Sequence, residues 1–462
     1  MADFDGLPVP RRTWSALAIW LAIVMAVLDG AIANVALPTI ARQLGVAADQ
    51  SIWVVNGFQL AIVVSLLPLA ALGEMIGYRR LFLSGIVVFT AASLGCAFAG
   101  GLSALIVARV AQGFGAAGIM SVNGALVRFT YPPRMLGRGI GLNALVVSAA
   151  AAFGPTVASG ILAVGPWQWL FAVNVPLGLL AFLVGRAALP VSPTSGQLDL
   201  LSTLLNVATF GLVFTGIDLL TRNGNAWLGG AELAVAVFSG LALIARSRAQ
   251  PRPLVPIDLL RNRIFTLSVL TSVASFSAQM LAFVSLPFFI QGVLHRGQVD
   301  TGLLMTPWPV AAGVAAAVAG RLADRLPAAI LSGAGLALLA LGLLSLALLP
   351  GDVASLAIVW RMALCGLGFG FFQSPNNRTM MSSAPLARSG AAGGMLATAR
   401  LTGQTIGATL AALTFRFAAN AEPIALGTAA GFAIAAAVAS LWRLRHAPSP
   451  PSSTPQPVAD AL

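Results

Sequence analysis

The fold is decided by the stretch Trp14-Ser-Ala-Leu-Ala-Ile-Trp-Leu-Ala-Ile-Val-Met-Ala-Val-Leu-Asp-Gly-Ala-Ile-Ala-Asn-Val-Ala-Leu-Pro38. An apolar run of this length is about what a helix needs to cross ~30 Å of hydrocarbon. A helical rise of ~1.5 Å per residue puts its one carboxylate, Asp29, roughly 22 Å beyond Trp14. An ionised group at that depth is costly unless it meets a polar or wet environment. The stretch predicts a membrane span whose Asp29 either packs against a polar neighbour or serves a proton or a substrate.

The composition of the whole chain points to the same class of protein. The chain has 462 residues, of which 58% are hydrophobic and 9% are charged. A soluble domain usually carries about 25% charged residues. The in-and-out alternation of a membrane β-barrel is not present in the sequence. We predict an all-α polytopic membrane protein.

The basic residues follow a membrane topology. The net charge of +12 comes from arginine, because the sequence contains no lysine. The arginines lie mainly in short loops on one side of the predicted spans, which the positive-inside rule assigns to the cytoplasm. We therefore expect a multi-pass protein of the bacterial inner membrane with both termini cytoplasmic. Its expected partner is the lipid bilayer, and nucleic acid is excluded because no basic soluble face is formed.

The sequence lacks the residue clusters of enzymes and metal proteins. Cys96 and Cys365 lie in distant apolar runs, where cysteine is usually a small packing residue. No nucleophile–base pattern and no His or Cys ligand cluster occurs. We predict no enzymatic activity, no metal site and no cofactor other than a proton gradient.

About fourteen apolar runs reach spanning length, and the chain repeats itself. Arg109, in Leu-Ile-Val-Ala-Arg-Val-Ala-Gln-Gly, is echoed by Arg361, in Ala-Ile-Val-Trp-Arg-Met-Ala-Leu-Cys-Gly. Duplicated bundles facing each other across a cavity are typical of alternating-access transporters. The predicted organisation is a cytoplasmic N-terminus (1–13), a six-helix bundle (14–190), two inserted helices (198–246), a cytoplasmic linker (247–263), a second six-helix bundle (264–444) and a disordered tail (445–462).

Several short motifs stand in order along these runs. Leu28-Asp29-Gly-Ala-Ile-Ala-Asn34 is in the first span, and Arg109-Val-Ala-Gln112-Gly is in the fourth. Phe153-Gly154-Pro155 interrupts the fifth. The loop motif Ala70-Ala-Leu-Gly-Glu74-Met-Ile-Gly77-Tyr-Arg79-Arg80 has a second copy, Gly320-Arg-Leu-Ala-Asp324-Arg325. Together these motifs resemble the fourteen-span drug/proton antiporter family of the major facilitator superfamily, whose members export quaternary ammonium compounds, methyl viologen and antibiotics.

The resemblance implies a major facilitator fold and assigns roles to the motif residues. Asp29 would carry the proton and Arg109 would tune it, although Arg109 could instead pair with backbone carbonyls. Gly154 and Pro155 would form the antiporter hinge, or only a packing kink. The cytoplasmic gate residues would be Glu74, Gly77, Arg79, Arg80, Asp324 and Arg325. For the arginine pair the alternative is solvated charge that only sets topology.

Polar residues inside the spans are candidates for a substrate cavity. They are Asn34, Gln59, Gln112, Asn143, Arg361, Asn376, Arg400 and Gln404. The second half has no mid-membrane acid, so Arg361 and Arg400 must use carbonyls, polar side chains, water or an anionic substrate group.

The expected function is proton-coupled export of amphipathic small molecules by a chain that works as a monomer. The alternative is a uniporter or proton symporter for one metabolite on the same fold. The family resemblance favours cationic substrates, whereas the buried arginines favour neutral or anionic ones, and the sequence leaves this open.

Overall fold

The structure is a computed structural model that describes residues 6–132, 135–192, 194, 199–221, 226–250, 257–323, 325–350, 353–384 and 389–446. Every regular element within these ranges is helical. Residues 447–462 of the predicted tail (445–462) and residues 251–256 of the linker (247–263) lie outside them, as does Asp324.

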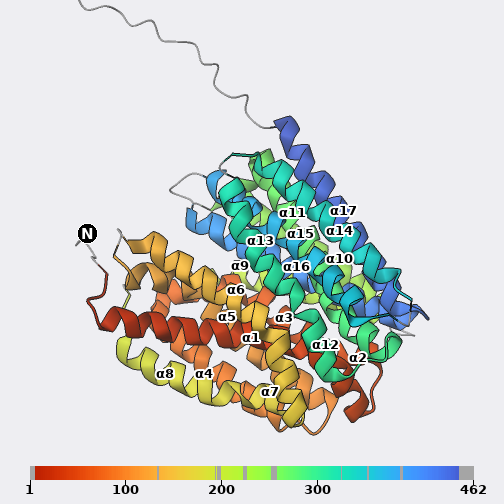
Figure 1. Cartoon of the computed structure of the whole chain (residues 1–462). Helices are drawn as coiled ribbons and strands as arrows, with labels where there is room; N and C mark the ends of the chain where they lie inside the picture. Colours follow the sequence, from red (N-terminus) through yellow and green to blue (C-terminus); the bar gives the residue numbers. More distant parts are fainter. Residues whose placement is uncertain are drawn as a thin grey trace, which may run out of the picture.

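The N-terminal half contains α1 to α8 (Figure 1). Its helices are α1 (Arg11–Leu44), α2 (Ala48–Ser51), α3 (Trp53–Ile76), α4 (Tyr78–Ala97), α5 (Leu102–Thr130), α6 (Leu136–Val164), α7 (Trp169–Ala172) and α8 (Asn174–Ala188). A hairpin of α9 (Leu200–Thr221) and α10 (Ala226–Ala249) follows.

The C-terminal half contains α11 to α17, preceded by the 3-10 turn Ile257–Arg261. Its helices are α11 (Arg263–Phe288) with the π-helical turn Phe289–Val293, α12 (Gln298–Met305), α13 (Pro307–Leu322), α14 (Ala328–Ala347), α15 (Ser355–Ser382), α16 (Ser389–Phe417) and α17 (Ala421–Trp442), followed by the 3-10 turn Arg443–His446.

The two halves repeat one packing pattern, as the Arg109–Arg361 echo suggested. In the N-terminal half α5 packs against α3 and α4, and α1 packs against α6 and α8. In the C-terminal half α15 packs against α13 and α14, and α11 packs against α16 and α17. Figure 1 shows the first group at the lower left and the second at the upper right.

The structure contains at least twelve of the fourteen predicted membrane spans. Within the described residues 12 helices are long and apolar enough to cross a membrane, and a pair bent by 42° within α6 would make 13. Helix α16 has 29 residues but is not among them. Fourteen spans remain a prediction.

Helix α1 is longer than its apolar run suggested. It begins at Arg11 and continues through Pro38 to Leu44, because an internal proline removes one backbone donor without stopping a packed helix. It ends where Gly45 adopts φ 64° and donates its N–H to the carbonyls of Ala41 and Arg42. This length carries α1 across the whole N-terminal half.

The two halves are joined at one end of the molecule. Thr39 donates to Gln298 (2.9 Å), Arg42 donates to Gln291 (3.2 Å), and Thr156 bonds Thr306 (2.7 Å). All of these contacts lie away from the chain termini, toward which the two groups of helices diverge in Figure 1. The structure is therefore closed at the end opposite the termini.

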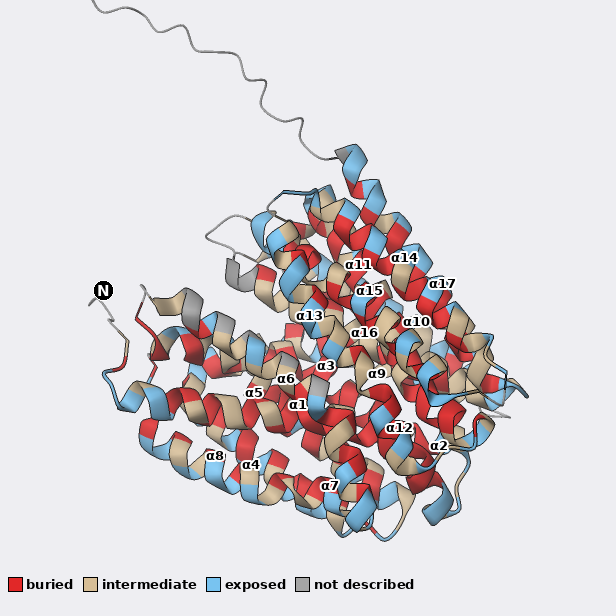
Figure 2. Ribbon diagram, viewed as in Figure 1, coloured by how far each residue is buried: buried red, intermediate tan, exposed pale blue. Residues whose placement is uncertain are grey.

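Apolar side chains cover the outside of the molecule. On α8, for example, Leu179, Leu180 and Leu183 are 57%, 48% and 56% exposed. In Figure 2 exposed residues, in pale blue, lie on the outer side of the helices, and buried residues, in red, lie inside each half. An apolar outer surface of this kind suits contact with lipid. The chain is a multi-pass membrane protein.

Candidate functional site

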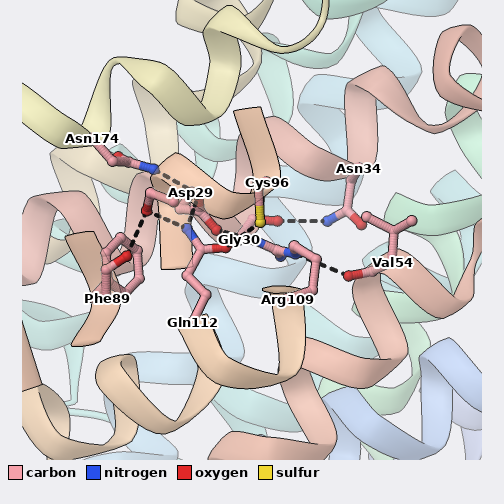
Figure 3. A network of polar contacts seen from close by, with 10 residues as sticks. Asp29, Gly30, Asn34, Val54, Phe89, Cys96, Arg109, Gln112 and Asn174 are labelled. Atoms are coloured by element: carbon pink, nitrogen blue, oxygen red, sulfur yellow. Dashed lines mark hydrogen bonds and ion pairs between the residues drawn. The ribbon is translucent and has the colours of Figure 1, made fainter. Parts of the chain in front are cut away.

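Asp29 lies in a buried polar network inside the N-terminal half (Figure 3). Its side chain is 1% exposed, and Oδ2 is ion-paired with Nη1 of Arg109 on α5. Its Oδ1 accepts from Gln112 Nε2 (2.9 Å) and from Asn174 Nδ2 (2.8 Å). Three donors from α5 and α8 thus converge on one carboxylate.

Arg109 is 0% exposed and has partners beyond Asp29. Its Nε donates to the carbonyl of Val54 (3.0 Å), and Nη1 also donates to Gln112 Oε1 (2.6 Å). Its guanidinium carbon lies 4.1 Å from the ring centroid of Phe58, a cation–π distance. Its Nη2 has no hydrogen-bond partner among the described residues. The cation is therefore held by one acid, one amide oxygen, one backbone carbonyl and the aromatic faces of Phe58 and Phe171.

A central cavity of about 210 Å³ lies between the two halves. Its wall includes Asn34 and Gln59 from the N-terminal half and Gln279, Arg400 and Gln404 from the C-terminal half. Aromatic side chains supply much of the remaining wall: Phe58, Phe276, Phe283, Trp308 and Phe369. Concave, mainly apolar sites with a few convergent polar groups are typical of small-molecule binding.

The network and the cavity share one wall. Asp29 does not line the cavity, but its neighbour Gly30 does, and so does Asn34, whose Nδ2 donates to the Gly30 carbonyl (3.1 Å). Phe58 also lines the cavity and contacts the Arg109 guanidinium. The Asp29–Arg109 pair therefore lies directly behind residues of the cavity wall.

Comparison with known proteins identifies the family. A model of the Major Facilitator Superfamily matches residues 19–408. The chain belongs to the Major Facilitator Superfamily. The predicted all-α major facilitator fold is confirmed, and so is the expectation that the protein is a transporter and not an enzyme.

Individual superfamily relatives come from bacteria. The chain is 51% identical to the uncharacterized transporter YebQ of Escherichia coli over 95% of its length and 97% of the relative. It is 29% identical to the riboflavin transporter RibZ of Clostridioides difficile, covering 84% and 85% of the two chains. It is 30% identical to the multidrug resistance protein Stp of Mycobacterium tuberculosis, covering 85% and 73%.

Four of the residues predicted to line the substrate cavity are not part of its wall. Gln112 belongs to the Asp29 network instead, because its amide faces the carboxylate. Asn376 is buried among Ser268, Ser272 and Arg443. Arg361 and Asn143 are also outside the wall.

Arg361 contacts residues of its own helix, α15. It donates to the Ala357 carbonyl (2.7 Å), and its guanidinium lies 4.2 Å from the ring centroid of Trp360. Its repeat partner Arg109 therefore has a different environment, although the sequence around the two residues is similar. The structure places Asn34, Gln59, Arg400 and Gln404 in the wall as expected.

The predicted gate residues are not joined to one another in the described residues. Gly77 provides the sharp reversal between α3 and α4 with φ 97°, a conformation that favours glycine. Arg79 donates to the carbonyl of Arg186. Glu74, Arg80 and Arg325 are exposed, and Asp324 lies outside the described residues. The gate assignment stays a prediction.

The predicted hinge lies at a close approach of three helices. A Cβ atom built at Gly154 would overlap the Ala31 side chain of α1. The carbonyl of the next residue, Pro155, lies against Gly302 of α12. Glycine permits this contact because its backbone has no side chain to exclude the neighbour. The motif thus lies on the seam between the two halves.

Sequence analysis missed some members of the site. Asn174 completes the Asp29 network, and Ser93 accepts from Gln112 Nε2 (2.8 Å). A buried asparagine at the start of α8 was a usable signal, whereas a serine in an apolar run was not. Gln279 and Gln373 line the cavity, and amides in apolar runs could have marked them.

Proposed function

We propose that this protein is a proton-coupled antiporter that exports amphipathic small molecules. The observation that carries the proposal is the shared wall between a buried Asp29–Arg109 pair and a central cavity. A buried ion pair contributes little net stability, so a functional role accounts better for its presence. Intramembrane ionisable residues commonly serve transport pathways and proton relays.

The coupling step follows from the charge of Asp29. Protonation of the carboxylate removes the partner charge of Arg109, which then depends on the Gln112 side-chain oxygen, the Val54 carbonyl and the Phe58 ring. Phe58 is part of the cavity wall, so the proton alters the surface that a substrate contacts. One site in this way responds to two ligands in turn, as exchange requires.

Export is supported by one relative and questioned by another. Stp is named a multidrug resistance protein, which fits export of amphipathic compounds. RibZ is named a riboflavin transporter, which favours the second candidate, a symporter or uniporter for one metabolite. Both candidates use the same fold, so direction must be measured.

The first test is a growth-inhibition panel of antibiotics and dyes in an efflux-deficient host. We compare the wild type with Asp29→Asn and with Asp199→Asn, a matched control because Asp199 pairs with Arg246 away from the cavity. Wild type and Asp199→Asn should protect the cells, and Asp29→Asn should not. Equal protection by all three at equal protein levels would show that Asp29 does not carry the proton.

The second test uses everted membrane vesicles with an acidified lumen and a pH-sensitive dye. A protective compound from the panel is added on the outside, which is the cytoplasmic face. Antiport should then alkalinise the lumen, because protons leave as the compound enters. A symporter would give no such response, since proton and substrate would have to leave the lumen together.

A further inference from the structure

The wall of the central cavity carries a positive charge without a balancing negative charge. Arg400, on α16, is the one charged residue among the described residues of its wall. The helices that form the wall contain only two acids, Asp29 and Glu74. Asp29 is neutralised by Arg109 behind the wall, and Glu74 is exposed near the end of α3. A molecule in the cavity therefore meets one positive charge and no negative charge to balance it.

The orientation of Arg400 is fixed by the packing of α16. Gly403 and Gly407 lie so close to α11 that a Cβ atom at either would overlap the backbone carbonyl of Val273 or of Ser277. These glycines hold one face of α16 against α11. Arg400 and Gln404, four residues apart on a neighbouring face, both reach the cavity. The packing of α16 on α11 thus keeps the Arg400 guanidinium at the cavity wall.

Two buried donors in the wall that the C-terminal half provides lack acceptors. Arg400 Nε and Trp308 Nε1 have no hydrogen-bond partner among the described residues, and the Trp308 side chain is 0% exposed. Buried polar groups without partners are rare, and each needs an explanation. A bound molecule that offers an acceptor oxygen to each donor would satisfy them.

The opposite wall presents an acceptor. Asn34 is 3% exposed, and its Nδ2 is already used by the Gly30 carbonyl, so its partnerless Oδ1 is the atom left for a ligand. The wall also contains aromatic side chains. Phe283 meets Trp308 edge-to-face with ring centroids 5.0 Å apart, and Phe276 meets Phe369 at 5.3 Å. Such surfaces favour flat aromatic molecules.

We propose that the cavity takes planar aromatic compounds that carry a carboxylate or another anionic group, and that it discriminates against organic cations. The inference rests on the proposed function only in taking the cavity as the transport site. The anionic group pairs with Arg400, whose planar fork suits a carboxylate, and it accepts from Trp308. A cation of the same shape would meet Arg400 without a compensating acid, and this repulsion supplies the specificity.

The test compares fluorescein with rhodamine 123, which share a xanthene skeleton and differ in the sign of their charge. Their dissociation constants for the purified full-length protein are measured in detergent by fluorescence anisotropy. We expect fluorescein to bind at least about tenfold more tightly, a difference of ~1.4 kcal/mol. Equal binding, preferential binding of rhodamine 123 or no binding of fluorescein would overturn the proposal.

Two cavity variants and one control variant assign the preference to particular residues. Arg400→Gln should remove it, while Arg361→Gln should keep it, because Arg361 is a second membrane arginine that lies outside the cavity wall. Trp308→Phe covers the case in which Arg400→Gln does not fold. It should weaken fluorescein binding about threefold to tenfold, the cost of one hydrogen bond, and leave rhodamine 123 unaffected. A preference unchanged in both cavity variants would contradict the proposal.

This experiment separates the substrate class from the coupling mechanism. Binding in detergent needs no proton gradient, so the preference of the wild type for fluorescein is measured independently of coupling. If that preference holds while Asp29→Asn still exports with the proton gradient, the coupling proposal fails and the substrate class stands. If coupling depends on Asp29 but rhodamine 123 binds as well as fluorescein, only the substrate class fails.

Discussion

In the N-terminal half Arg109 lies against the carboxylate of Asp29, whereas in the C-terminal half Arg443 is buried among neutral groups. Arg443 is 3% exposed and donates to Ser268 Oγ (2.9 Å) and to Asn376 Oδ1 (2.8 Å). Both halves therefore bury an arginine in a polar network. Only the first network contains a group that can gain and lose a proton, because arginine stays charged in proteins.

This difference divides the work of transport between the halves. A proton can change the charge of the N-terminal network, while the buried arginines of the C-terminal half keep a constant charge. The constant charge includes Arg400, which faces the cavity. In our proposals the N-terminal half carries the proton, and the C-terminal half recognises the substrate.

The largest expected effect comes from removing the acid of the first network. Asp29→Ala leaves Arg109 as an uncompensated buried cation, which should cost about 3–5 kcal/mol of stability. The double variant Asp29→Ala, Arg109→Met removes both charges and should regain most of that loss. The measurement is the unfolding midpoint in detergent. An equal loss in the two variants would show that packing, and not charge pairing, holds this site.

The Asp29–Arg109 pair also shows how far sequence analysis reaches. A carboxylate and an arginine, each alone in an apolar run, have to find a polar partner, so their meeting could be predicted. The alternatives for Arg109 were not exclusive, because it binds both Asp29 and the Val54 carbonyl. The fold was also accessible, since apolar run length and the repeat determine it.

The wall of the cavity was less accessible from sequence. Whether a polar residue faces the cavity or a neighbouring helix depends on helix rotation, which a nearly uniform apolar run does not define. Gln112 and Asn376 turned toward other helices for this reason, while Gln279 and Gln373 turned inward. Close approaches such as Gly302 against Pro155 depend on tertiary packing between the halves.

The second prediction tests the joint through which one half acts on the other. A side chain at Gly302 would overlap the Pro155 carbonyl and Ser159 Oγ. Gly302→Val should therefore destabilise the closed seam by about 1–3 kcal/mol. The readout is labelling of a cysteine introduced at Thr39, which lies on that seam. Labelling should become about tenfold faster, as a shift of ~1.4 kcal/mol requires.

Gly160→Val is the matched control for the seam. It lies on α6 next to Ser159, and a Cβ atom built there meets nothing within 4 Å. Its labelling rate should equal that of the parent cysteine variant. If Gly302→Val labels no faster than this control, the halves do not open by separating α12 from α6.

The third prediction concerns the neutral network of the C-terminal half. Asn376→Ala removes the side-chain oxygen that accepts a hydrogen bond from Arg443. It also removes the amide group that donates to the Ser272 hydroxyl. It should cost about 1.5–3 kcal/mol, the value of hydrogen bonds to a charged group. This is less than the loss in Asp29→Ala, because Arg443 keeps its serine partners. The unfolding midpoint is measured beside that of Asn377→Ala, its half-buried neighbour. A loss as large as that of Asp29→Ala would contradict the contrast between the halves.

The smallest effect is expected from an acid–arginine pair at the surface. Asp199, just before α9, accepts from Arg246 Nε (3.0 Å) and Nη2 (3.1 Å), but the two side chains are 26% and 39% exposed. Solvent screening limits the stabilisation by such pairs, so Asp199→Asn should cost at most about 1 kcal/mol and leave transport unchanged.

Hydrogen bonds from Arg246 lower the pKa of Asp199 in the folded state. A lowered folded pKa gives a contribution that is complete above the unfolded value of about 3.9 and is lost as the pH falls through the folded pKa. The unfolding midpoints of wild type and Asp199→Asn should therefore differ by a constant amount between about pH 5 and 8 and converge only in stronger acid. A difference that instead grew with acidity, or a transport defect in Asp199→Asn, would show that burial is not what separates this pair from Asp29 and Arg109.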